Sequence, residues 1–188
     1  MRKLKLQVQI SVDGYVAGPN GELDWMTWNL DSKLIEFINS ITDSSDTILL
    51  GRKMTEGFVK YWENVQPDSP EYDFAKKMVG YPKIVFSKTL DHVEGKNISV
   101  ENGDLVTVVN ELKKQDGKDI IVYGGATFVS SLIKEGLIDE FNFFINPVMI
   151  NKGMRIFDQL NNRQKLSLIT ATPYECGVTV VKYNLSND

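Results

Sequence analysis

The sequence predicts an α/β protein with a mixed, mostly parallel sheet, helices on both faces and an antiparallel C-terminal edge. Apolar, strand-like segments alternate with helix-like segments along most of the chain. Two strand-like segments lead directly into glycines that precede a helical pattern, and the chain closes with two strand-like segments separated by a turn. The alternation favours parallel strands joined by helical crossovers, whereas the closing pair favours antiparallel strands.

Each expected element rests on the spacing of apolar residues and on turn or cap residues at its ends. In the N-terminal half we expect strands at 4–12, 47–50 and 83–86, and helices from the N-cap Asp31 to about 41, at about 52–61 and at 71–79. In the C-terminal half we expect helices at 105–114 and about 127–134, and strands at 98–100, 119–123, 141–150, 166–172 and 178–184.

The composition limits the classes of protein to which this chain can belong. The 188 residues are 42% hydrophobic and 24% charged, without a Ser/Gly-rich linker or repeat, so we expect one domain over residues 1–188. The net charge of −4 disfavours nucleic acid and anionic membranes as partners. No apolar stretch approaches the ~20 residues of a transmembrane helix, and the N-terminal residues lack a signal-peptide pattern, so we expect a cytoplasmic protein.

The chain contains one histidine, His92, and one cysteine, Cys176. A zinc site needs several such ligands, so we expect no metal centre. A Ser-His-Asp triad would have to use His92, whose polar surroundings are typical of an exposed loop.

Three strand ends carry residues suited to binding phosphate. Glycines let a phosphate approach the free N–H groups of a helix start, and additional cations favour the 2′-phosphate of NADPH. Taken singly, each turn is also typical of an ordinary surface turn, but together the three predict a site for a dinucleotide. The residues are Gly51, Arg52, Lys53, Met54 and Thr55 at the first end, Ser87 and Lys88 at the second, and Gly124, Gly125, Ala126 and Thr127 at the third.

The segment 18–28 combines turn residues with Trp25 and Trp28. One interpretation is a lid that closes over a flat heteroaromatic substrate, and the other is a pair of tryptophans in the core. Leu34 and Phe37 lie on the apolar face of the next helix, where we expect them first in the core and second as lining of a substrate pocket.

Five segments, at 11–18, 48–52, 83–87, 121–125 and 136–140, occur in the order and spacing of the dihydrofolate reductase-like superfamily. Over nearly the whole chain, the sequence resembles the reductase domain of the bifunctional riboflavin-biosynthesis deaminase/reductase, above all at 11–14 and 136–147. The resemblance implies a three-layer α/β/α fold and an often dimeric, NADPH-dependent reductase. It also implies a pterin-like or ribosylaminopyrimidine-like substrate.

Carried over residue by residue, the resemblance assigns contacts along the whole cofactor. It also implies a cis peptide bond between Gly124 and Gly125. The ribose and 2′-phosphate contacts fall on Arg52, Ser87 and Lys88, the pyrophosphate contacts on Lys53, Met54, Gly125, Ala126 and Thr127, and the nicotinamide contacts on Val16, Ala17 and Gly18.

Three positions depart from the family pattern. Lys33 stands where dihydrofolate reductases carry an acidic residue that contacts the pterin ring, and a lysine cannot accept a hydrogen bond, which argues against dihydrofolate reduction. Tyr15 stands where the riboflavin enzyme has lysine, and Met54 where dihydrofolate reductases favour threonine.

Two functional hypotheses follow. The first is an NADPH-dependent reductase of a small heterocyclic substrate, acting as a homodimer, in which Asp13 or Asp31 is the candidate proton donor. Each aspartate also has a structural interpretation, Asp13 as a turn residue and Asp31 as an N-cap. The alternative hypothesis, motivated by Lys33, is an NADPH-binding module without reductase turnover.

Overall fold

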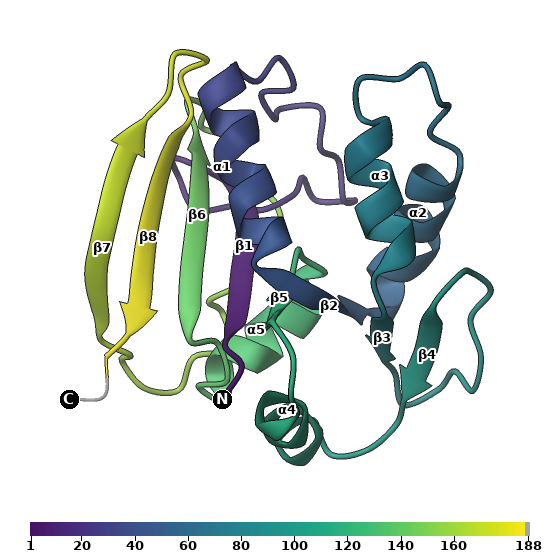
Figure 1. Ribbon diagram of the computed structural model, residues 1–188. Helices are drawn as coiled ribbons and strands as arrows, with labels where there is room; N and C mark the ends of the chain where they lie inside the picture. Colours follow the sequence, from purple (N-terminus) through teal and green to yellow (C-terminus); the bar gives the residue numbers. More distant parts are fainter. Residues whose placement is uncertain (187–188) are drawn as a thin grey trace.

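The computed structural model describes residues 1–186 and is built around one eight-stranded sheet (Figure 1). Its strand order is β4-β3-β2-β5-β1-β6-β8-β7. The strands are β1 (Leu4–Ser11), β2 (Ser45–Gly51), β3 (Lys83–Phe86), β4 (Ile98–Glu101), β5 (Asp119–Val122), β6 (Glu140–Asn146), β7 (Leu166–Pro173) and β8 (Thr179–Leu185). The helices are α1 (Ser32–Asp43), α2 (Arg52–Glu63), α3 (Tyr72–Gly80), α4 (Leu105–Lys114) and α5 (Ala126–Lys134).

The first six strands of this order pair in parallel, and β8 runs antiparallel to both of its neighbours, β6 and β7. Parallel neighbours cannot be joined by a tight turn, so longer crossovers connect them. As a result, β1, β2, β3, β5 and β6 all end at the same edge of the sheet, which we call the carboxyl edge.

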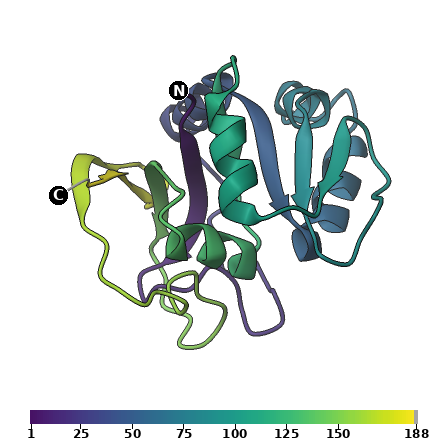
Figure 2. The same ribbon diagram turned by 90° about the horizontal axis from the view of Figure 1, so that it is seen from below.

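Helices cover the two faces of the sheet unequally (Figures 1 and 2). The core of one face joins Leu34 of α1, Phe58 of α2 and Met78 of α3 to alternate residues of the central strands. The core of the other face joins Val109 of α4 and Leu132 of α5 to the intervening residues of the same strands. This is the three-layer arrangement with a mixed sheet that the sequence predicted.

The expected elements are present, and the largest difference concerns the strand expected at 141–150. This strand, β6, ends at Asn146, because Pro147 has no N–H group to continue the ladder. The first strand also ends one residue early, at Ser11, where a turn closed by the hydrogen bond from Gly14 N to Ser11 O begins. His92 lies in an exposed loop, as predicted. Within residues 1–186, no helix is long and apolar enough to cross a bilayer.

Substitutions at a buried residue of β5 and at an exposed residue test which side chains form the core. Ile121 is fully buried between β1 and β2, so we expect Ile121→Ala to lower the free energy of unfolding by about 2–5 kcal/mol through lost contacts and a residual cavity. Val12 is 60% exposed, and Val12→Ala should change stability by less than about 0.5 kcal/mol. Urea unfolding measures both values, and equal effects would contradict the assigned core.

Candidate functional site

Two helices begin with glycine at the carboxyl edge, and neither helix has a side-chain cap. Gly51 is the N-cap of α2 and Gly125 is the N-cap of α5. By contrast, the carboxylate of Asp31 caps α1 and that of Asp104 caps α4. A carboxylate cap satisfies the first N–H groups of a helix with a negative charge, whereas a glycine cap leaves those groups free for an external anion. The starts of α2 and α5 are therefore suited to binding phosphate.

The two uncapped helix starts lie against each other. A Cβ atom added at Gly125 would lie 3.7 Å from the Cα atom of Gly51. One added at Gly51 would lie 2.6 Å from the Cβ atom of Phe128, in the first turn of α5, which is closer than such atoms approach. Gly124 faces Met54, whose sulfur atom would lie 3.3 Å from an added Cβ. Only glycine at position 51 lets β2 and the start of α5 approach this closely.

The predicted cis bond between Gly124 and Gly125 was wrong, because the structure contains no cis peptide bond among its described residues. Gly125 turns the chain with φ 85° and ψ 86°, a left-handed conformation that glycine adopts without a side-chain penalty. A trans bond also avoids the ~3–4 kcal/mol that a cis bond costs outside proline.

The predicted cation cluster is assembled only in part. Arg52 and Lys53 are exposed at the start of α2, and Arg52 Nη1 donates to Thr89 Oγ1 at 3.3 Å, which joins the ends of β2 and β3. Ser87 Oγ accepts from the backbone N–H groups of Thr89 and Leu90. Lys88 Nζ, however, donates to the carbonyl oxygens of Asn102 and Gly103, both at 2.6 Å, and is therefore directed to the end of β4.

Thr55 and the remaining residues of the two helix starts have different surroundings. Thr55 is buried and its hydroxyl donates to Gly51 O at 3.1 Å, so it stabilises the turn and is not directed outward. Ala126 is half-buried and Thr127 exposed in the first turn of α5.

The segment expected to contact nicotinamide is held firmly. Val16, Ala17 and Gly18 are buried, and Val16 N and Ala17 O exchange hydrogen bonds with Met154 O and N at 2.9 and 2.8 Å. Gly153 is required beside this pairing, since an added Cβ would lie 2.1 Å from Ala17 O. The backbone beyond β6 therefore holds this segment at the carboxyl edge.

Asp13 and Asp31 both accept hydrogen bonds from backbone N–H groups. Asp13 accepts from Ser11 Oγ, Asn151 N and Ile150 N, and Asp31 accepts from Leu34 N and Cys176 N. Desolvation raises the pKa of each carboxyl group, but these hydrogen bonds outweigh it and hold each pKa below its usual value. Both groups are therefore ionised at neutral pH and are not arranged as proton donors.

The residues expected to line a substrate pocket are not gathered around one cavity. Leu34 is fully buried in the core beneath α1, and Phe37 packs against Phe144 and Tyr174 with ring centroids 6.1 and 6.4 Å apart. Trp25 is half-buried and donates from Nε1 to Glu22 O, whereas Trp28 is 67% exposed. The core interpretation of the two tryptophans was therefore wrong, and Leu34 is a core residue only.

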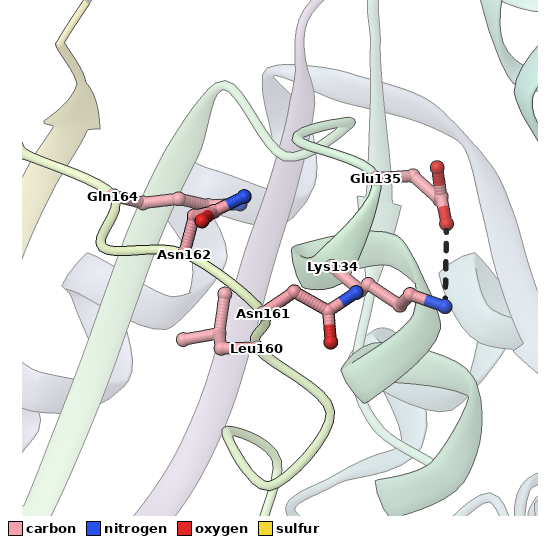
Figure 3. A pocket seen from close by; sticks show the side chains of 6 residues that line it. All are labelled: Lys134, Glu135, Leu160, Asn161, Asn162 and Gln164. Atoms are coloured by element: carbon pink, nitrogen blue, oxygen red, sulfur yellow. Dashed lines mark ion pairs between the residues drawn. The ribbon is translucent and has the colours of Figure 1, made fainter.

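Two hollows lie away from the carboxyl edge. One of about 300 Å³ lies at the end of α5, where polar side chains surround Leu160 (Figure 3). Its lining residues are Lys134, Glu135, Leu160, Asn161, Asn162 and Gln164. A shallower one of about 610 Å³ lies between α2 and the loop before α3, lined by Gly57, Lys60, Tyr61, Asn64, Val65, Ser69 and Glu71. Neither hollow contains a residue that the sequence assigned to cofactor or substrate.

Two residues that shape the carboxyl edge, Phe128 and Asn146, were not predicted from the sequence. Phe128 packs on Gly51 and stacks on Phe86 with ring centroids 5.2 Å apart. The side chain of Asn146 is fully buried and accepts from Thr27 N at 2.8 Å, which anchors the tryptophan segment to β6. An asparagine at the end of a mostly aromatic and aliphatic strand was the available signal for this role.

Arg155, which was not predicted from the sequence, pairs with Tyr15 just beyond the end of β1. Arg155 Nη2 donates to Tyr15 Oη at 2.7 Å, and the guanidinium lies 4.5 Å from the centre of the tyrosine ring. The hydroxyl of Tyr15 in turn donates to Asn151 O. The Arg155 guanidinium therefore lies beside Tyr15, the position at which the riboflavin enzyme carries lysine.

Together, the strand order and the glycine-capped helices define a dihydrofolate reductase-like fold. A solved dihydrofolate reductase from Enterococcus faecalis, complexed with NADP(H), superposes with a TM-score of 0.63 at 16% identity over 99% of this chain and 97% of that one. The sequence pattern of the RibD C-terminal domain matches residues 2–180, and the chain belongs to this family.

Two further proteins show how far the similarity extends. The uncharacterised protein YyaP of Bacillus subtilis is 34% identical over 184 residues, which cover 97% of this chain and 95% of YyaP. The diaminohydroxyphosphoribosylaminopyrimidine deaminase/5-amino-6-(5-phosphoribosylamino)uracil reductase of Thermotoga maritima superposes with a TM-score of 0.70 at 13% identity. That comparison covers 98% of this chain but 57% of the bifunctional enzyme.

The contact at Gly51 yields a prediction about stability. Gly51→Ala should destabilise the protein by about 1–3 kcal/mol, because its methyl group collides with Phe128 and has no flexible neighbour to displace. Gly57 lies six residues beyond Gly51, within α2, with open space around it, so Gly57→Ala should stabilise by about 0.5–1 kcal/mol. Thermal and urea unfolding of the two variants measure the difference, and equal values would contradict the close approach.

A second prediction separates the two interpretations of Asp31. Because its pKa is lowered in the folded protein, the stabilisation it provides is present above the unfolded pKa and is lost as the pH falls through the folded pKa. At pH 7 we expect Asp31→Asn to lower the melting temperature less than Asp31→Ala, since an amide oxygen still caps the helix but carries no charge and cannot replace both carboxylate oxygens. If the reductase activity expected from the sequence is found and survives in Asp31→Asn, a proton-donor role is contradicted, whereas its loss in a variant that is still folded supports one.

Proposed function

We propose that this protein is an NADPH-dependent reductase that transfers hydride to a pteridine-like or ribosylaminopyrimidine-like small molecule. The observation that carries the proposal is the contact between two glycine-capped helix starts at the carboxyl edge, with Arg52 and Thr89 beside it. Free N–H groups on two adjoining helices suit the pyrophosphate of a dinucleotide, and an adjacent arginine suits a further phosphate group.

In this proposal NADPH lies across the carboxyl edge, with its 2′-phosphate at Arg52 and its nicotinamide at residues 16–18. The pyrophosphate would lie on the N–H groups around Lys53, Met54, Gly125, Ala126 and Thr127, close to Gly51. Arg52 and the hydroxyl of Ser87 would contact the 2′-phosphate and ribose, and Lys88 would join them after Nζ leaves its two carbonyl partners. The nicotinamide would lie on Val16, Ala17 and Gly18. NADPH would supply the hydride.

The chain itself would position the two reacting rings and exclude water. Val16–Gly18 is fixed by its pairing with Met154, and it offers backbone groups against which a flat ring can be oriented. The segment that carries Trp25 would close over the substrate, since an indole face stacks well on a heterocycle. Because Asp13 and Asp31 are ionised, water is the proposed proton donor.

Family membership supports reductase chemistry, and two residues, Lys33 and Arg155, narrow the range of substrates. Lys33 pairs with Glu175 at the exposed start of α1 and offers no acceptor for an aminopyrimidine edge, which disfavours dihydrofolate. Arg155 provides a cation near Tyr15, which favours a substrate with an anionic group such as the phosphoribosylamino chain. The proposed activity is therefore similar to that of a 5-amino-6-(5-phosphoribosylamino)uracil reductase.

The cofactor assignment predicts a specific effect of Arg52→Ala. Loss of a charge-assisted contact to the 2′-phosphate should weaken NADPH binding about 10- to 100-fold and leave NADH binding nearly unchanged. Quenching of tryptophan fluorescence in parallel titrations measures both affinities. Arg163→Ala, which removes an exposed arginine from the loop before β7, is the matched control and should bind NADPH like the wild type.

Three outcomes of these measurements lead to different conclusions. If the wild type binds neither nucleotide, or if Arg52→Ala weakens both equally, the proposed cofactor site is wrong. If NADPH binds tightly but is not oxidised with any dihydropteridine, pterin or ribosylaminopyrimidine, the alternative of a binding module without turnover is correct. NADPH oxidation that depends on one of these substrates supports the reductase.

A further inference from the structure

Two amide side chains lie side by side where β1 and β6 end. Gln9, near the end of β1, is half-buried, whereas Asn146, the last residue of β6, is fully buried. The Nδ2 atom of Asn146 donates to Oε1 of Gln9 at 2.8 Å. Gln9 pairs with Phe144 in the sheet, so its side chain lies on the face of the sheet that α1 covers.

Backbone groups fix the orientation of the Asn146 amide. Its Oδ1 atom accepts from Thr27 N at 2.8 Å, and its Nδ2 atom donates to Phe144 O at 3.1 Å as well as to Gln9. A backbone N–H group only donates and a backbone carbonyl group only accepts, so exchanging the two ends of this amide would break both bonds. Asn146 therefore always offers a hydrogen-bond donor to Gln9.

The orientation of Asn146 in turn fixes that of Gln9. Only the oxygen of the Gln9 amide can accept from Asn146, so its NH2 group lies on the other side. Within residues 1–186, Nε2 of Gln9 has no hydrogen-bond partner, and it is not sealed from water as Oε1 of Gln7 is. Gln9 therefore presents a donor, and not an acceptor, to a molecule that lies beside it.

The Gln9 donor lies one step along the strand from the proposed nicotinamide site. Side chains two residues apart share a face of a strand and are about 7 Å apart, so Ser11 follows Gln9 on this face. Ser11 N donates to Tyr15 O at 2.8 Å, and Ser11 Oγ accepts from Tyr15 N at 2.9 Å. This pairing holds the chain directly before residues 16–18. A ring stacked on the nicotinamide at this face therefore lies within reach of Gln9.

Aromatic residues lie near the same amide. Phe37 of α1 is half-buried and packs against Phe144, the sheet partner of Gln9, with ring centroids 6.1 Å apart. Trp25 belongs to the segment that Asn146 anchors through Thr27. A donor in such surroundings discriminates strongly between ligands, because a ligand group that cannot accept leaves the donor unpaired and desolvated.

We propose that Gln9 selects the heterocycle that this protein reduces, by donating from Nε2 to a carbonyl oxygen on the edge of the substrate ring. The inference rests on the proposed reductase function and specifies its substrate class, a dioxo ring of the uracil or lumazine type. A diamino ring carries amino groups in place of the carbonyl groups and would set a donor against the Gln9 donor. Lys33, paired with Glu175, likewise offers such a ring no acceptor.

Binding of two matched heterocycles tests the proposal, with NADP⁺ present so that no hydride is transferred. Lumazine carries two ring carbonyl groups where 2,4-diaminopteridine carries two amino groups. The wild type should bind lumazine at least about 10-fold more tightly than the diamine, as measured by isothermal titration calorimetry. Gln9→Glu keeps an oxygen for Asn146 but replaces the outward donor by an acceptor, so it should reduce this ratio at least about 10-fold.

A control variant and a folding measurement accompany this comparison. Gln115 is exposed at the end of α4, and Gln115→Glu introduces the same change of charge away from the carboxyl edge. It should bind both heterocycles like the wild type. Circular dichroism should show that Gln9→Glu is folded, because its carboxylate still accepts from Asn146 and stays in contact with water.

Three results would overturn the inference and leave the reductase proposal standing. One is a wild type that binds the diamine as tightly as lumazine. Another is a Gln9→Glu variant that binds both heterocycles more weakly by the same factor, which would make Gln9 a structural support of this edge only. The last is a Gln115→Glu variant whose ratio changes as much as that of Gln9→Glu. A wild type that binds NADP⁺ but neither heterocycle would overturn both the inference and the substrate class of the proposed function.

Discussion

The carboxyl edge depends on the close approach of two backbones, that of Gly51 at the end of β2 and that of Gly125 at the start of α5. β2 and β5 are neighbours in the sheet, so the turns that follow them must share one small space. Glycine at both positions lets Phe128 pack directly on the end of β2. A larger residue at position 51 would separate the two helix starts and spread apart the N–H groups that face the same region.

These four helix N-termini fall into two groups, those capped by aspartate and those that begin at glycine. α1 and α4 are closed by aspartates that are part of the protein, which stabilises the fold without reference to any ligand. α2 and α5 begin at glycines and leave their positive ends unmatched, which costs some intrinsic stability. Binding of an anion, as proposed, would recover that cost and would couple the stability of this edge to occupancy of the site.

The sequence predicted elements well where local patterns decide the outcome. Residues 83–86 and 105–114 form a strand and a helix with the expected bounds, because apolar spacing and an aspartate N-cap act over only a few residues. Features that depend on tertiary contacts were harder to predict from the sequence. Lys88 turns to the carbonyl groups of Asn102 and Gly103, because acceptors 14 and 15 residues away in the sequence decide its direction. The trans peptide bond between Gly124 and Gly125 was likewise not predicted. The conformation of these two residues depends on their packing against Met54 and Gly51 of the neighbouring turn.

The anchors of the tryptophan segment define how it can move. At one end, Gly18 N is hydrogen-bonded to Glu22 O and Ala17 is paired with Met154. At the other end, Thr27 N is bound by the buried side chain of Asn146. Residues 19–26, which include Trp25, lie between these two anchors, whereas Trp28 lies beyond the second anchor. Of the two indoles, Trp25 is therefore the one whose fluorescence would report opening and closing.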